Sequence, residues 1–333
     1  MKYVIIGAGV AGVTAAETVR KIDSDGEIVL IGKEQFLPYK RYLLTEFFCG
    51  TISKEQLFSL SCEDLKRLKI TFRKGQLAKS VDFENKKVKL FHNETVSYDK
   101  LLIATGGKPR IGPALRSFEK NLQLYYSLED ILLIKEKLDS VRTCVVFGQG
   151  LSTLDLMAGL KNLKKEVIYI TKKPRAFFPL LQSNSDVDVH QFLSEKGVKI
   201  ITNDRPVSVE KRDDKFIVET FNGEKLTADL VFAWDDYRPN IRFLENTKID
   251  RKIGILVNEQ LRTSVEDVYA AGDCAEIYHP KIKNYWINFG YPNAIEQGET
   301  AGKNMTGLNE NYRIRETLVF HVLGKPFEAR WWE

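Results

Sequence analysis

Residues 2–12 read KYVIIGAGVAG, an apolar run that meets three regularly spaced glycines. The run from Tyr3 to Ile6 predicts a short buried strand, and helical periodicity follows from Val10 to about Ile22. The glycines of the turn between them are Gly7, Gly9 and Gly12. Glycine at these places permits a tight turn, close approach of the backbone to a pyrophosphate, and close packing of helix on strand. Because the helix start also offers free N–H groups and a positive dipole end, the stretch predicts a dinucleotide-binding unit.

The second strand of this unit, Glu27 to Ile31, does not end in the acidic residue that usually holds ribose hydroxyls. The chain continues as Gly32-Lys33-Glu34, which makes Glu34 the candidate for that role. A solvated turn carboxylate is an equally good interpretation of Glu34.

A second unit with the same plan begins at the apolar run Thr143 to Phe147. Gly148 and Gly150 follow, then a helix to about Asn162 and a strand from Glu166 to Ile170. Alternating stretches at 76–81, 86–91 and 207–220 predict an antiparallel insertion in each unit. A further strand followed by glycine and aspartate lies far downstream, at 267–273. The pattern predicts an α/β fold with two Rossmann-like (doubly wound) dinucleotide-binding domains, the first of them discontinuous.

Composition excludes several classes of protein. The 333 residues are enough for about two domains, and 43% of them are hydrophobic and 29% charged, as in globular proteins. The net charge of +5 is too small to indicate nucleic acid; it fits an acidic partner or a phosphate-bearing ligand, or simply a solvated surface. The four cysteines and four histidines show no disulfide or metal-ligand spacing. Because no long apolar run or signal segment is present, we expect a cytoplasmic location and no membrane contact.

Six motifs in this order resemble the FAD-binding, two-dinucleotide-domain oxidoreductases of the pyridine nucleotide-disulfide type. They lie at 7–12, 37–41 (LPYKR), 102–106 (LIATG), 148–153, 238–240 (RPN) and 267–273 (DVYAAGD), and the last is the most specific. The resemblance implies an FAD-binding domain at 1–112 and 241–310, an NAD(P)-binding-like domain at 113–240, and the remnant of a C-terminal interface domain at 311–333. With so little of that interface domain, the usual homodimer of the family is doubtful, and Trp331-Trp332 either anchors a partner or packs on its own domain.

The resemblance also implies which residues hold FAD. Asp273 corresponds to an aspartate that binds the ribityl chain, and the helix that starts near Tyr291 and Pro292 faces the flavin, where its dipole stabilises reduced flavin. The complete candidate set is Gly7, Gly9, Gly12, Glu34, Arg41, Thr105, Gly106, Gly272, Asp273 and Tyr291. No side chain is expected to act as a catalytic acid or base.

The residues after Arg41 separate this chain from the disulfide reductases of the family. The stretch 41–46 reads RYLLTE and has no cysteine, so no thiolate would be available for exchange with a disulfide or attack on a peroxide. On a helix, Cys49 would lie about two turns beyond Tyr42. It could not take the place of the missing cysteine without a rearrangement of the chain. The segment is similar instead to the rubredoxin reductases, oxygenase ferredoxin reductases and the flavin part of nitrite reductases. Glu46 stands where those proteins often have lysine.

The second unit departs further from the family. Thr153 replaces the third glycine, Asp155 replaces the usual glutamate, and a carboxylate pair, Asp235-Asp236, would repel a pyrophosphate if it faced one. Cations follow the second strand at Lys172 and Arg175, which would favour a 2′-phosphate unless they form only a solvated basic turn. The candidate nicotinamide-nucleotide residues are Gly148, Gly150, Asp155, Lys172 and Arg175, and NADPH is at least as plausible a donor as NADH.

The resemblance thus implies an FAD-dependent NAD(P)H oxidoreductase that passes electrons to a rubredoxin- or ferredoxin-like acceptor. The alternative is an FAD-containing electron-transfer subunit that has lost nicotinamide binding and uses its second domain for docking. A disulfide or peroxide reductase is the weakest of the three hypotheses because of the missing cysteine.

Overall fold

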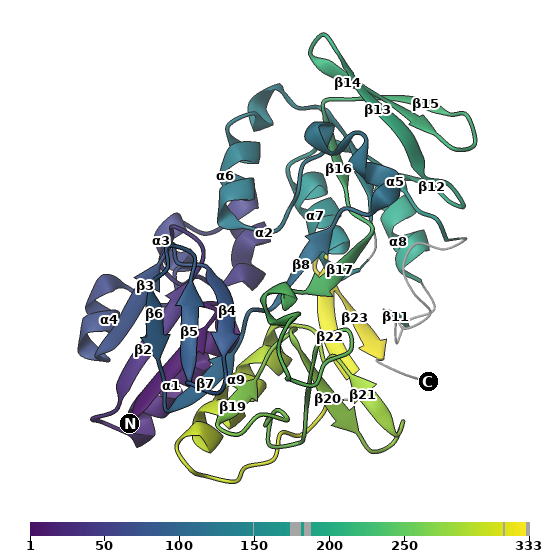
Figure 1. Ribbon diagram of the computed structural model, residues 1–333. Helices are drawn as coiled ribbons and strands as arrows, with labels where there is room; N and C mark the ends of the chain where they lie inside the picture. Colours follow the sequence, from purple (N-terminus) through teal and green to yellow (C-terminus); the bar gives the residue numbers. More distant parts are fainter. Residues whose placement is uncertain (149, 174–180, 183–187, 316, 331–333) are drawn as a thin grey trace. The chain divides into compact units, whose positions relative to one another are not determined.

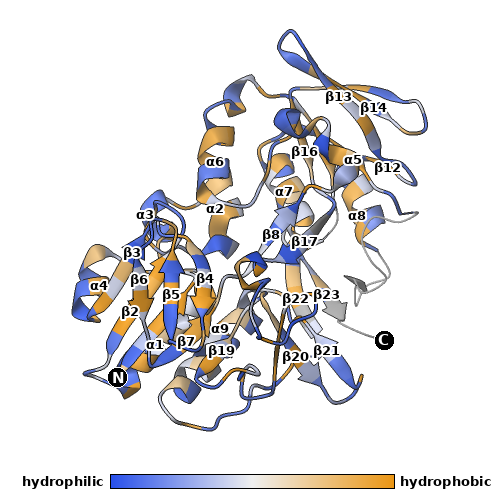
Figure 2. Ribbon diagram, in the orientation of Figure 1, coloured by the Kyte–Doolittle hydropathy of each residue, from blue (hydrophilic) through white to orange (hydrophobic). Residues whose placement is uncertain are grey.

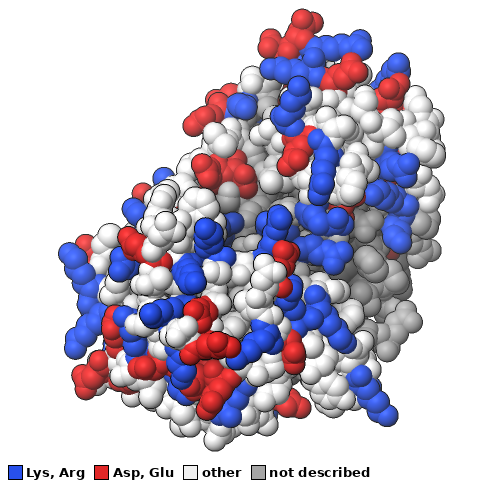
Figure 3. All heavy atoms as spheres, in the orientation of Figure 1, with Lys and Arg blue, Asp and Glu red and all other residues white. Residues whose placement is uncertain are grey.

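The computed structural model describes residues 1–148, 150–173, 181–182, 188–315 and 317–330 (Figure 1). Its contacts divide the chain into two compact units. Unit 1 consists of Met1–Tyr42, Lys54–Gly107 and Arg238–Arg315, and unit 2 consists of Leu43–Ser53, Lys108–Tyr237 and Glu316–Glu333. Among the described residues, no helix is long and apolar enough to cross a membrane. Cationic and anionic side chains are interspersed over the face drawn in Figure 3.

Unit 1 is built on a five-stranded parallel sheet in the order β19-β7-β1-β2-β3. The strands are β1 (Lys2–Ile6), β2 (Glu27–Gly32), β3 (Ile70–Lys74), β7 (Lys100–Ile103) and β19 (Val268–Ala270). The inner strands are apolar along their length, because both faces of a parallel sheet are covered in this kind of fold (Figure 2). Their carboxyl ends therefore meet at one edge of the sheet.

Helices α1 (Val10–Ile22) and α9 (Tyr291–Met305) pack against each other through small residues. A Cβ atom on Gly298 would lie 2.4 Å from the carbonyl oxygen of Ala11, and one on Gly302 would lie 2.9 Å from that of Ala15. Neither position has room for a side chain, so the two backbones approach more closely than larger residues would allow. This packing fixes α9, which comes from the end of the chain, beside the helix that follows the first glycine turn.

The rest of unit 1 consists of short helices and antiparallel strands. One antiparallel sheet is β4 (Ala78–Asp82), β5 (Lys87–Leu90) and β6 (Thr95–Ser97), as the alternating stretches predict. A mixed sheet contains β18 (Ile255–Val257), β20 (Ala275–His279) and β21 (Asn284–Trp286). The helices are α3 (Lys54–Leu57) and α4 (Cys62–Arg67), the latter starting at a capping box between Ser61 and Asp64.

Unit 2 has a four-stranded parallel sheet in the order β12-β10-β9-β16. The strands are β9 (Thr143–Phe147), β10 (Glu166–Ile170), β12 (Val198–Ile201) and β16 (Leu230–Ala233). Helices α5 (Pro113–Arg116), α6 (Leu128–Lys135), α7 (Leu151–Asn162) and α8 (Val189–Glu195) accompany it, together with the antiparallel strands β13 (Pro206–Arg212), β14 (Lys215–Thr220) and β15 (Lys225–Ala228). Strands β8 (Gly107–Arg110) and β17 (Asp236–Pro239) form a two-stranded sheet.

Two segments belong to unit 2 although the sequence suggests otherwise. Helix α2 (Leu44–Cys49), which lies within the range assigned above to the FAD-binding domain, packs on α6 and α7. The C-terminal segment forms a hairpin of β22 (Thr317–Val322) and β23 (Lys325–Arg330), and β23 pairs with β11 (Leu181–Gln182). Phe327 of the hairpin packs 5.5 Å from Phe192 of α8, between ring centroids. Trp331 and Trp332 lie outside the described residues.

Candidate functional site

The first glycine turn has the geometry that its spacing predicts. Gly7 has φ +117°, and a Cβ atom there would lie 2.1 Å from the carbonyl oxygen of Ala104 in the neighbouring strand connection. A Cβ atom on Gly12 would lie 1.9 Å from the carbonyl oxygen of Gly7, so helix α1 packs directly on the turn. The middle residue, Gly9, has open space around it and is the N-cap of α1 without a side-chain acceptor. The first-turn N–H groups of α1 therefore remain available to an anionic ligand.

Glu34 and Arg41 meet in an ion pair near the end of β2. The Arg41 guanidinium donates to one Glu34 carboxylate oxygen at 2.6 Å, and the Tyr39 hydroxyl donates to the other at 2.8 Å. The Arg41 guanidinium also lies 5.0 Å from the centre of the Tyr39 ring. Both candidate residues are partly exposed. The carboxylate thus holds the planar cation in place, so the two residues work as a pair.

Asp273 follows Gly272 at the carboxyl end of β19, the strand beside β7. Burial raises the pKa of the Asp273 carboxyl to about 6, against the opposing influence of the Gly290 N–H group and the Arg41 guanidinium. Gly272 has φ +78°, and its N–H group donates to the buried side chain of Gln297 at 2.7 Å. Aspartate, arginine and the start of α9 therefore lie close together.

The remaining candidates of unit 1 lie at the same edge. Thr105 and Gly106 directly follow β7, and Gly106 has φ +61° with open space at its Cβ position. Tyr291 is the first residue of α9, and its ring stacks on Tyr42 with centroids 4.0 Å apart and an angle of 18° between the planes. The candidate FAD residues thus follow strands of one sheet at their carboxyl ends or border the start of α9, and Arg41 is joined to this group through its ion pair with Glu34.

The second glycine turn keeps the strand-to-helix geometry despite the loss of its third glycine. Gly150 has φ +100°, open space at its Cβ position, and caps α7 without a side-chain acceptor. Thr153 and Trp234 are both fully buried, and a Cβ atom on Gly148 would lie 3.0 Å and 3.1 Å from them. The added bulk is thus accommodated beside Gly148, whose carbonyl oxygen accepts a hydrogen bond from the Tyr169 hydroxyl at 2.8 Å.

Lys172 pairs with Asp235, a contact that neither residue's position in the sequence indicates. The ammonium lies 2.8 Å from one carboxylate oxygen of Asp235, and the other oxygen accepts the N–H group of Gly112 at 2.8 Å. Asp235 is therefore mostly shielded from solvent, and its negative charge is paired with a cation. Arg175, the other cationic candidate, lies outside the described residues.

Two acidic side chains of unit 2, Asp155 on α7 and Glu46 on α2, influence each other. Asp155 on α7 is an exposed residue, yet the surrounding protein displaces enough water to raise the pKa of its carboxyl to about 7, and the Glu46 carboxylate adds to the effect. Glu46 belongs to α2, which approaches α7 at Gly159; a Cβ atom there would lie 3.2 Å from Thr45. Tyr125 completes the cluster through a hydrogen bond to Thr45 at 2.9 Å. Sequence reasoning named Glu46 and Asp155 separately but missed Tyr125, for which no motif gave a signal.

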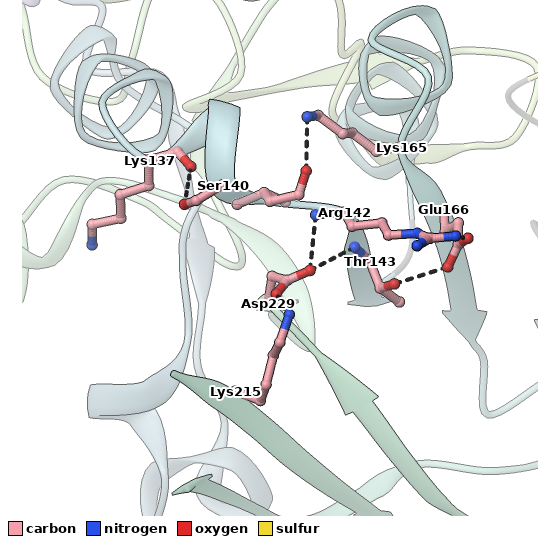
Figure 4. Close-up of polar contacts among 9 residues, drawn as sticks. Lys137, Ser140, Arg142, Thr143, Lys165, Glu166, Lys215 and Asp229 are labelled. Atoms are coloured by element: carbon pink, nitrogen blue, oxygen red, sulfur yellow. Dashed lines mark hydrogen bonds and ion pairs between the residues drawn. The ribbon is translucent and has the colours of Figure 1, made fainter. Parts of the chain in front are cut away.

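A different polar cluster lies where the strands of the parallel sheet of unit 2 begin, away from the glycine turn (Figure 4). Asp229 accepts the N–H groups of Arg142 and Thr143 at 2.8 Å each and forms an ion pair with Lys215. This cluster stabilises the start of β9 and includes none of the candidate residues.

The family model for pyridine nucleotide-disulphide oxidoreductases matches residues 1–302. The chain belongs to this family. An NADH-rubredoxin oxidoreductase from Clostridium acetobutylicum is 29% identical over 322 residues, with 93% of this chain and 76% of the relative covered. An NADH oxidase from Methanocaldococcus jannaschii is 28% identical over 94% of this chain and 71% of that protein.

A solved structure of a covalent putidaredoxin reductase–putidaredoxin complex is also similar to this oxidoreductase. It matches with a TM-score of 0.86 and 25% identity, with 98% of this chain and 80% of that chain covered. The resemblance inferred from the motifs and the predicted fold class of two Rossmann-like domains are therefore both confirmed.

Proposed function

We propose that this chain is an FAD-dependent NAD(P)H oxidoreductase that passes electrons to a small redox protein. The observation that carries the proposal is the pair of glycine turns, one in each unit, each with an uncapped helix start and open space at Gly9 or Gly150. Two such turns in one chain suit two dinucleotides. The relatives named for NADH oxidation and rubredoxin reduction support the same activity.

FAD would be held by unit 1. The diphosphate would lie at the start of α1, the ribose near Glu34, and the ribityl chain near Asp273. When bound, FAD accepts a hydride and releases electrons singly, so the chemistry belongs to the flavin. The chain's residues bind and orient it. The raised pKa of Asp273, about 6, still lies below neutral pH, so this carboxyl is mostly ionised there and would accept hydrogen bonds from ribityl hydroxyls.

The nicotinamide nucleotide would be held by unit 2. Its diphosphate would lie at the start of α7, between Gly148 and Gly150, with Asp155 one turn further along the helix. Thr153 does not close this turn, since its side chain is buried beside Gly148. Lys172 and Arg175 follow β10, on the side where the adenosine ribose lies in dinucleotide-binding folds.

The acceptor we propose is a rubredoxin- or ferredoxin-like protein, with no role for nucleic acid or membrane. The stretch 41–46 contains no cysteine that could act as a nucleophile beside the flavin. Burial raises the pKa of the nearby Cys49 thiol, which donates weakly to the carbonyl oxygen of Gly159 at 3.7 Å, so this residue is an inert structural cysteine. An acceptor that takes single electrons needs no such thiol.

The alternative of a flavoprotein without nicotinamide binding is favoured by the bulk of Trp234 and Thr153 near Gly148. One experiment separates the two hypotheses: the purified flavoprotein is mixed anaerobically with NADH or NADPH, and the absorbance of oxidised flavin is followed. We expect rapid bleaching with one of the two donors. A flavin that dithionite reduces but neither nucleotide bleaches would refute the proposed function and support the alternative.

A further inference from the structure

We infer that Asp235 decides the choice of electron donor by occupying Lys172, and that the chain therefore favours NADH over NADPH. The inference rests on the proposed function, because it concerns the adenosine end of the nucleotide site in unit 2. It revises the expectation from sequence, in which Lys172 and Arg175 follow β10 as cations and would attract a 2′-phosphate.

The ion pair lies across the edge of the sheet where a nucleotide would bind. Lys172 follows β10 and Asp235 follows β16, while β9 and its glycine turn lie between these two strands. The Lys172 ammonium is also 5.3 Å from the centre of the ring of Phe147, the last residue of β9. The pair thus spans the carboxyl end of β9 just before Gly148.

Asp235 is held firmly enough to keep Lys172 engaged. Its side chain is 13% exposed, against 41% for Lys172, and both of its carboxylate oxygens accept hydrogen bonds. The Gly112 N–H group fixes one oxygen from a third segment of the chain. The carboxylate thus faces the Lys172 ammonium on one oxygen and a backbone N–H donor on the other, and its negative charge offsets that of the lysine.

This charge balance disfavours a 2′-phosphate. Such a group carries a charge of about −1.5 to −2 at pH 7, so its attraction to Lys172 is offset by its repulsion from the paired Asp235. It would therefore gain little from Lys172 in return for the water it loses, whereas the hydroxyl of NADH loses much less. NADPH could gain the lysine only by displacing a carboxylate that the Gly112 N–H group holds in place.

The test uses variants of each partner in the FAD-loaded protein. Asp235→Asn keeps an oxygen for the Gly112 N–H group but removes the charge, so Lys172 becomes free. Lys172→Met removes the cation and leaves the carboxylate. The matched control is Lys215→Met, which breaks the comparable ion pair with Asp229 at the opposite edge of the sheet (Figure 4). Dissociation constants of ADP, 2′,5′-ADP, NADH and NADPH are measured by titration calorimetry at low and high salt.

We expect Asp235→Asn to shift the preference toward the 2′-phosphate by about tenfold at low salt, and by less at high salt. Lys172→Met should weaken NADPH binding instead, the double variant should lose the gain, and Lys215→Met should match the wild type. An unchanged preference in Asp235→Asn, with all ligands still binding, would overturn this inference and leave the proposed function intact. If no variant and no wild-type protein binds any of the four nucleotides, both are overturned.

Discussion

Tyr42 stacks on Tyr291 although they are 249 positions apart in the chain, so the residue after Arg41 touches the first residue of helix α9. Both rings are partly exposed, at 36% and 47%. The stack joins the end of the LPYKR segment to the helix start that the family places at the flavin. It is an aromatic contact that holds two candidate FAD-binding segments of unit 1 together.

Tyr291→Ala should therefore lower the free energy of unfolding by about 1 kcal/mol, the usual value of an aromatic pair beyond its buried area. Tyr291→Phe keeps the ring and should remain close to the wild type. Urea unfolding of the flavin-loaded protein measures both. Equal losses in the two variants would mean that the hydroxyl, and not the stack, stabilises this segment.

The first glycine turn predicts opposite outcomes for two neighbouring alanine variants. Gly12→Ala places a Cβ atom 1.9 Å from the carbonyl oxygen of Gly7, so the helix must move and the apoprotein should lose several kcal/mol of stability. Gly9→Ala meets open space, so the apoprotein should unfold at the wild-type temperature. The new methyl group would, however, lie where a diphosphate approaches and should lower flavin content. Thermal unfolding and the flavin-to-protein absorbance ratio distinguish the two effects.

The ion pair between Arg41 and Glu34 near the end of β2 can be tested by substitution of the arginine. Arg41→Lys keeps the charge but loses the planar guanidinium that donates to Glu34 and lies over Tyr39, so we expect FAD affinity to fall by about tenfold. Lys40→Arg, a change of the same kind at the adjacent cation, should leave FAD affinity unchanged. Fluorescence of released FAD gives both constants. A similar loss in both variants would indicate a nonspecific effect of charge in this segment.

The carboxyl of Asp155 should make stability depend on pH. Its pKa is about 7 in the folded chain and near 3.8 when unfolded, so between these values the folded state binds more protons. Stability must therefore fall as the pH rises from about 4 to about 7. Asp155→Asn should raise the unfolding temperature relative to wild type at pH 8 and have little effect at pH 4. Since Asp155 is exposed on one side, solvent screening reduces the size of the effect.

Glu46→Gln provides the control for this pH dependence, because the Glu46 carboxylate contributes to the raised pKa of Asp155. The variant should move the fall in stability to lower pH without abolishing it. If the pH profiles of all three proteins coincide, Asp155 is hydrated as an ordinary surface carboxylate.

The sequence predicted an element correctly where all the residues that determine it are close together in the chain. The β1 to α1 segment is one case, because apolar run, glycine spacing and helical period all lie within about twenty residues. Strand β3 was missed since only Ile70 among its five residues is buried, so it has no apolar signature. It belongs to the parallel sheet because it pairs with β2 at the edge.

The candidate site likewise contains residues that a local motif predicts and a contact that only the fold creates. Glycines and Asp273 were predictable because their backbone conformations or positions are fixed by motif. The contact between Lys172 and Asp235 was not, since 63 residues separate them and only the strand order β10-β9-β16 brings them together. From the sequence alone Lys172 was expected to bind a phosphate, whereas in the fold it forms an ion pair with Asp235.

The order β19-β7-β1-β2-β3 also has a consequence for synthesis of the chain on the ribosome. Strand β7 is complete at Ile103, but its neighbour β19 starts only at Val268, after all of the 108–237 segment has emerged. During that interval the hydrogen-bonding edge of β7 has no partner strand and is open to pairing with other chains. A nascent chain arrested before Val268 would therefore be the form most prone to aggregation, and the one most in need of a chaperone.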